Sequence, residues 1–126
     1  MQQKIIIDTN IYIDIFNSGH HQNLRNPFQY IVFLAHPVLL NIKDDDVLEK
    51  LIIHLREMGL KGIEAYYPEQ PHDLTARYIK IADRHGLLIT GGTDFHGSIK
   101  PEIKMGSGRG NFFVPYELYE KLISCL

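Results

Sequence analysis

The stretch of the chain best suited to chemistry is residues 90–97, where Asp94 and His96 stand two residues apart among glycines. It follows the apolar segment 86–90, whose pattern predicts a strand. Residues two apart in extended backbone point the same way, so we expect both side chains to reach one pocket. A carboxylate and an imidazole together are ligands for divalent metal ions. The stretch therefore predicts part of a metal site.

A second candidate, His36, follows the continuous apolar run 30–35 and precedes Pro37. Pro37 has no backbone N–H and stops the predicted strand, which fixes where His36 points. A lone histidine at a strand end is often structural. With Asp94 and His96 on the same predicted rim, membership of a metal or phosphate site is the favoured interpretation.

Three more residues are candidates for substrate contact. Glu64 lies in the predicted strand 62–66 and is either a buried, paired carboxylate or a group that reaches the rim. Tyr66 could stack on a base or a sugar, although such tyrosines commonly pack in the interior. Arg109 lies in the glycine-rich run 106–111, whose amides could hold a phosphate. That run lacks the Gly-Lys-Ser/Thr of a P-loop, so a flexible loop is the alternative.

The elements that must position these residues alternate between strand and helix. Strands are expected at 4–7, 30–35, 62–66 and 87–90, and helices at 44–58, 73–85 and from 115 onward. This order, with short connections, predicts an α/β fold with a mostly parallel sheet of four or five strands built from βαβ units. Ligands of such sheets gather at the carboxyl ends of the strands. We therefore expect His36, Tyr66, Asp94 and His96 on one rim.

The helices are expected to bury one apolar face each. In helix 44–58 the spacing predicts an inward stripe, and in the last helix it predicts a shorter one. The first comprises Val47, Leu48, Leu51, Ile52, Leu55 and Met58, and the second comprises Leu118, Leu122 and Ile123. Gly59 and Gly86 are placed to end the first two helices.

Length and composition favour one globular domain spanning residues 1–126. The chain has 126 residues, 44% of them hydrophobic, and its net charge of −2 gives no basic footprint for nucleic acid. The single cysteine, Cys125, cannot form an internal disulfide, which suggests a reducing compartment. No run is long and apolar enough for a membrane span. We expect a soluble cytoplasmic protein with no membrane partner.

Four motifs in order resemble the C-terminal half of the PHP (polymerase and histidinol phosphatase) family. They are the segments 34–37, 62–68, 91–97 and 106–111. The resemblance implies a distorted, seven-stranded TIM-like barrel that hydrolyses phosphoesters with a cluster of two or three metal ions. It makes His36, Asp94 and His96 metal ligands. It also implies zinc, manganese or iron as the metal and a phosphorylated small molecule, such as a nucleotide or a short RNA end, as the substrate.

The chain departs from the family pattern in its N-terminal part, which contains no His-x-His motif. Since a catalytic zinc ion needs about three or four protein ligands, the remaining ones would have to come from Asp8, His20, His21 or a second chain. Residues 31–126 would then form half a barrel. Its exposed sheet edge predicts a homo-oligomer or a partner chain. Whether the chain is an active phosphoesterase or a non-catalytic interaction module stays open at this point.

A shorter resemblance concerns the N-terminal segment 1–30. Residues 5–14 are similar to the opening of PIN-domain ribonucleases, in which the aspartate equivalent to Asp8 binds a metal ion and Asn10 stays nearby. The later acidic residues of that family are not evident here. A PIN-type ribonuclease that uses Asp8 is therefore a third reading.

Overall fold

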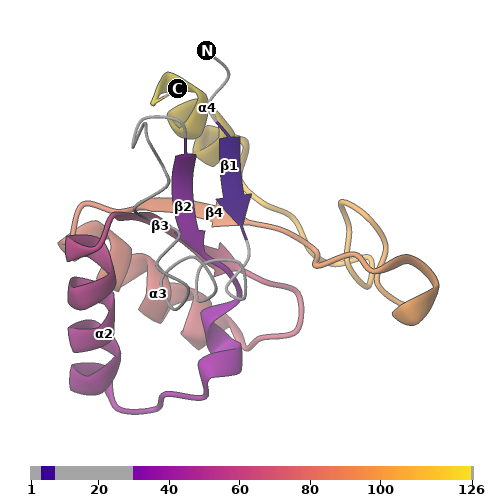
Figure 1. Ribbon diagram of the computed structural model, residues 1–126. Helices are drawn as coiled ribbons and strands as arrows, with labels where there is room; N and C mark the ends of the chain where they lie inside the picture. The colour runs from indigo at the N-terminus through magenta and orange to yellow at the C-terminus, as the bar shows by residue number, and fades with distance from the viewer. Residues whose placement is uncertain (1–3, 8–29, 126) are drawn as a thin grey trace.

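The computed structural model describes residues 4–7 and 30–125 of the chain. Strands β1 (Lys4–Ile7), β2 (Tyr30–Leu34), β3 (Leu60–Tyr66) and β4 (Leu88–Gly91) form one parallel sheet in that order (Figure 1). The predicted α/β class and parallel sheet are confirmed. The sheet is open within the described residues, with β1 and β4 at its edges, and no closed barrel is seen among them.

Helix α2 (Asp45–Glu57) connects β2 to β3 and begins at a carboxylate cap. The side chain of Asp44 accepts a hydrogen bond of 3.0 Å from the N–H of Val47, as an N-cap does. Leu48 and Ile52 are each 1% exposed and lie in the core. Val47 and Met58, which the spacing had placed in the same stripe, are exposed instead, so the buried face is narrower than predicted.

Helices α3 (His72–Arg84) and α4 (Tyr116–Ser124) complete the fold. α3 packs on β3 and buries Tyr78, Ile81 and Ala82 in the same core as α2. α4 contacts β4, but Ile123, predicted to face inward, is 47% exposed. None of the helices in the described part of the chain is long and apolar enough to cross a bilayer.

Strand β2 is buried on both faces, as its continuous apolar run predicted. Leu34 joins the core shared with the helices, and the alternation of a strand puts Ile31 and Phe33, also buried, on the opposite face. Gly62 of the neighbouring β3 gives Phe33 its room, because a Cβ at this glycine would overlap the Phe33 ring. The face of the sheet opposite α2 and α3 is therefore closely packed at Phe33 and Gly62.

An irregularity in β3 decides which side chains reach each face of the sheet. Ile63 and Ala65 belong to the helix-side core, as alternation requires. The pairing with β4 then shifts register between Glu64 and Tyr66, and Tyr66 also packs on the helix side. A bulge of this kind re-aims the residues that follow it. In consequence Tyr67, not Tyr66, joins Glu64 on the face away from the helices.

The connection between β4 and α4 projects from the body of the molecule (Figure 1). It contains the short 3-10 helix η4 (Gly97–Ile99); a similar turn, η3 (Pro37–Leu40), follows β2. Ile103 anchors this connection with only 1% exposure, while Ile99 and Met105 are largely exposed. Residues that follow β4 are thereby held beyond the carboxyl rim of the sheet.

Candidate functional site

Residues that follow three neighbouring strands meet at the carboxyl end of the sheet. The backbone N–H of His36, after β2, donates a hydrogen bond of 2.7 Å to Oε2 of Glu64 in β3. The rings of His36 and Tyr67 have centroids 5.8 Å apart, and the Tyr67 hydroxyl lies 3.2 Å from Oδ2 of Asp94, after β4. These contacts form a continuous chain from β2 to β4, in the place where parallel sheets bind ligands.

Two of these residues have backbone conformations that side chains rarely adopt. His36 has φ of 30° and Asp94 has φ of 52°, and Asn41 is the one further non-glycine residue with positive φ in the described part of the chain. Such strain costs free energy and is concentrated at functional sites. The predicted extended backbone at 94–96 is therefore wrong: a turn carries Asp94 and His96.

The turn gives His96 a defined tautomer. Its Nδ1 lies 2.6 Å from the carbonyl oxygen of Asp94 and 3.5 Å from the carboxylate Oδ1 of the same residue. Because a carbonyl oxygen can only accept, Nδ1 is the donor, and in the neutral imidazole the lone pair is then on Nε2. Histidines that bind metal ions commonly have their second ring nitrogen held in this way. The half-exposed His96 is thus prepared to bind a metal ion or accept a proton through Nε2.

Glu64 is a buried carboxylate on the inner side of this cluster, with 6% exposure. Burial raises its pKa above the usual value for a glutamate, and the nearby charge of Asp94 adds to this, while the hydrogen bond from His36 opposes it. Its Oε1 would lie 3.1 Å from a Cβ placed at Gly92, so the carboxylate fills the space between two strand ends. From this buried position Glu64 supports the backbone of the residues that follow β2 and β4.

Tyr67, Glu69 and Lys100 form a charged rim around Asp94. The Tyr67 hydroxyl is 3.1 Å from Oε2 of Glu69, and Nζ of Lys100 lies 3.2 Å from that same oxygen and 3.6 Å from Oδ2 of Asp94. Burial, together with the adjacent carboxylates, raises the pKa of Tyr67, so its hydroxyl stays protonated as a donor. Sequence reasoning missed Glu69 and Lys100, because no motif marks them, and it did not select Tyr67 as a site residue.

Arg109 reaches the outer part of this rim. Its guanidinium lies 3.5 Å from Glu69 and 3.6 Å from Glu102, and half of the side chain is exposed. The glycine-rich run is a tight turn, in which Lys104 and Gly108 exchange backbone hydrogen bonds. A Cβ at Gly108 would stand 3.1 Å from Pro68. The run is therefore packed against the end of β3, and only the Arg109 side chain extends toward the cluster.

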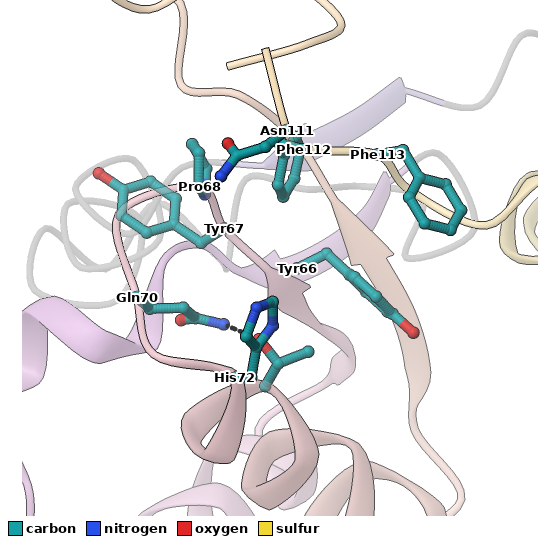
Figure 2. A pocket seen from close by; sticks show the side chains of 9 residues that line it. Tyr66, Tyr67, Pro68, Gln70, His72, Asn111, Phe112 and Phe113 are labelled. Atoms are coloured by element: carbon teal, nitrogen blue, oxygen red, sulfur yellow. Dashed lines mark hydrogen bonds between the residues drawn. The ribbon is translucent and has the colours of Figure 1, made fainter. Parts of the chain in front are cut away.

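Tyr66 contributes to a different feature, a cavity of about 280 Å³ on the helix side of β3. The cavity lies between the start of α3 and residues 111–113, and its wall includes Gln70, His72 and Phe112. Both Tyr66 and Tyr67 line the cavity, and Figure 2 shows their rings directed to opposite sides. The structure thus brings His36, Glu64, Asp94 and His96 together and places the Tyr66 ring apart from them.

The described residues do not by themselves make a complete metal site. No three side chains of His, Cys, Asp or Glu gather closely enough there to hold a metal ion. Asp94 and His96 offer suitable donor atoms, but a catalytic zinc site takes about three protein ligands. Asp8, His20 and His21, named above as further sources of ligands, lie outside the described residues, as does the PIN-like segment beyond strand β1.

One curated relative matches part of the chain. A stretch of 67 residues is 39% identical to a phosphoribosyl 1,2-cyclic phosphate 1,2-diphosphodiesterase of Eggerthella lenta, a match that covers 53% of this chain and 23% of that protein. No family model matches the chain, and no solved structure matches it significantly. The chain therefore resembles a segment of a phosphoesterase and spans about a quarter of its length.

Proposed function

We propose that the chain is a PHP-like, metal-dependent phosphoesterase whose site is the cluster at the carboxyl end of β2, β3 and β4. The observation that carries this proposal is the coincidence of a 39% identical stretch of a phosphodiesterase with a partly buried cluster of acid and imidazole groups, two of which have strained backbones. Identity alone covers too little of the relative to transfer its activity. The cluster supplies independent support, because its residue types suit phosphoester hydrolysis.

Each group of the cluster has a role in this proposal. Asp94 and His96, with His36, would contribute ligands to divalent zinc, manganese or iron, which supplies Lewis acidity toward a phosphoryl oxygen. Lys100 and Arg109 are cations at the rim, and in the absence of an anion they pair with Glu69. A phosphate group entering the rim would compete with that carboxylate for both cations.

The substrate class in this proposal is a small phosphorylated molecule. The relative's name specifies a phosphoribosyl cyclic phosphate, so a sugar phosphate diester joins nucleotides among the candidates. Completion of the metal site requires ligands beyond the described residues. We propose that they come from the N-terminal segment or from a second chain, and that the whole assembly forms the TIM-like barrel of the family.

The test is hydrolysis of phosphoribosyl 1,2-cyclic phosphate, a nucleoside monophosphate and a chromogenic phosphodiester with added Mn²⁺, Zn²⁺ or Fe²⁺. We expect turnover that a chelator abolishes, and a loss of about 100-fold or more on Asp94→Asn, since a ligating carboxylate is removed. Asp83→Asn on the exposed side of α3 is the matched control and should leave the rate unchanged. Absence of turnover on every ester with every metal ion, or full activity of Asp94→Asn, contradicts the proposal.

A second candidate function is a non-catalytic interaction module. It is favoured by the incomplete ligand set of the described residues and by the exposed aromatic side chains of Phe113 and Tyr116. This candidate predicts no metal ion in elemental analysis of the purified protein and a stable complex in solution. Stoichiometric metal that is lost with Asp94→Asn favours the enzyme instead.

A further inference from the structure

We propose that Glu64 is a positioning residue that holds the His36 turn against the β4 end, at a cost to the stability of the fold. This inference rests on the proposed function, since it assigns a supporting role within the same site. The distinctive observation is that one buried carboxylate accepts a hydrogen bond from one strand end that carries a candidate ligand and lies close to the other. Its Oε2 accepts the His36 N–H at 2.7 Å, and its Oε1 faces Gly92.

The contact with His36 acts on a strained residue. His36 has φ of 30° and ψ of 61°, in the left-handed region, where a residue with a side chain is strained. Such a conformation persists only where its surroundings impose it. The main chain of His36 is fixed on one side by Pro37 and on the other by the Glu64 carboxylate. The hydrogen bond therefore determines where the His36 imidazole is presented at the rim.

The contact with the β4 end acts through Gly92. A Cβ at this position would stand 3.1 Å from Oε1 of Glu64, which is tighter than most real Cβ contacts, so a larger residue here would require the carboxylate to shift by a few tenths of an ångström. Gly92 in turn donates its N–H to the carbonyl of Tyr66 at 3.1 Å. Only Thr93 separates Gly92 from Asp94. One carboxylate thus sets the distance between the His36 turn and the Asp94 turn.

This arrangement is unfavourable for folding when considered alone. Glu64 is 6% exposed, and none of the ion pairs formed among the described residues includes it. A buried carboxylate without a cation loses hydration that one backbone hydrogen bond does not fully replace. Removing the carboxylate would relieve this loss of hydration but would leave the His36 N–H without its acceptor, so the two effects on stability oppose each other. If Glu64 served only to pack the interior, its replacement would instead lower the stability of the fold.

The experiment compares Glu64→Met, which removes both acceptors, with Glu64→Gln, which keeps one oxygen for the His36 N–H. For Glu64→Met we expect an unchanged or raised midpoint of thermal unfolding together with a kcat lowered about 10- to 100-fold and little change in KM, the size found for residues that orient metal ligands. Glu64→Gln should recover most of this loss. Glu57→Met, at the exposed end of α2, is the control and should change neither quantity.

A second measurement tests the hydrogen bond without activity. In the metal-free protein, the amide proton resonance of His36 should lie downfield because a carboxylate accepts it, and it should move upfield in Glu64→Met and only partly in Glu64→Gln. An ordinary His36 amide shift that is the same in wild type and Glu64→Met overturns the inference. So does a lost hydrogen bond with unchanged kcat, or a fall in kcat that follows a fall in stability. Absence of wild-type turnover on any ester defeats the proposed function alone, and the amide shift still decides whether Glu64 holds the turn.

Discussion

At the scale of single residues, the Tyr67 hydroxyl connects the interior of the site to its charged rim. It lies between the carboxylates of Asp94 and Glu69, at 3.2 and 3.1 Å, while the ring of Tyr67 stays 4% exposed beside His36. A neutral donor between two anions lowers their mutual repulsion. The raised pKa of Tyr67 keeps that donor protonated throughout the neutral range.

Tyr67→Phe should therefore lower the free energy of unfolding by about 1.5–3 kcal/mol, the range for losing a hydrogen bond to a charged group. The ring and its packing remain, so the change isolates the hydroxyl. Denaturant unfolding with a common m-value measures the difference. Tyr116→Phe removes the hydroxyl of a 67% exposed tyrosine and should stay within about 0.5 kcal/mol of wild type. If Tyr67→Phe changed the free energy of unfolding as little as Tyr116→Phe does, the Tyr67 hydroxyl would not stabilise the fold.

The residues of the cluster differ in how far the sequence could reveal them. His36, Asp94 and His96 were predictable because each follows an apolar run that ends at glycine or proline. Tyr67 was not selected, since strict alternation from Glu64 points to Tyr66, and only the shifted register between β3 and β4 places Tyr67 on the site face. Lys100 follows η4, a short turn that hydrophobic periodicity does not predict.

At the scale of elements, the carboxylate of Glu49 joins α2 to the end of α3 outside the core, because it interacts with both Arg84 and His85. Glu49 of α2 accepts from Arg84 at 2.8 Å and lies 2.6 Å from Nε2 of His85, at the end of α3. The hydrogen bond with His85, followed by the one from Arg84, lowers the pKa of Glu49 below its ordinary value of 4.5. A depressed pKa stabilises the fold above that ordinary value, and the contribution is lost as the pH falls through the folded-state pKa.

Glu49→Gln should consequently lower the thermal unfolding midpoint at neutral pH, and the difference from wild type should shrink as the pH falls below 4.5. Because the pair is on the surface, added salt should reduce the difference as well. Thermal scans between acidic and neutral pH measure both effects. Glu120→Gln on the exposed side of α4 serves as the comparison. A difference that is constant across the whole pH range would contradict this role of Glu49.

The elements themselves were largely predictable, and their irregular parts were not. The sheet and α2, α3 and α4 follow from hydrophobic periodicity with glycine and acidic boundaries, and they occur within a few residues of the predicted ranges. The bulge in β3 and the turn at Asp94 have no local signature, because tertiary pairing imposes them. The exposed positions of Val47 and Ile123 likewise depend on which neighbour covers each helix.

At the scale of the whole molecule, the surface of α4 indicates an interface. Phe113, Tyr116, Tyr119 and Ile123 are all between 47% and 73% exposed, and the three within α4 have the spacing of one helix face. The rings of Tyr116 and Tyr119 lie 5.5 Å apart, so they form a continuous aromatic surface. α4 contacts β4, an edge of the open sheet. Aromatic side chains gathered at such an edge are typical of a surface that binds another protein.

We predict that a second copy of the chain covers this surface. Association would bury the α4 aromatics and could shield the outer edge of β4, along which no other strand of the described residues pairs. Light scattering coupled to gel filtration should then give a mass of at least twice 14.6 kDa at micromolar concentration. The double substitution Tyr116→Ser and Tyr119→Ser should return the single-chain mass. Leu39→Ser, which removes a 64% exposed apolar side chain after β2, should not.

The same measurement bears on the site, because a partner chain is one source of the metal ligands that the described residues lack. If the second copy supplies them, the serine variant should lose bound metal together with its association, although Asp94 and His96 are unchanged. If the N-terminal segment supplies them, metal should remain on the dissociated chain. A wild-type mass of 14.6 kDa at every concentration, with metal bound, would contradict self-association and leave the N-terminal segment as the source.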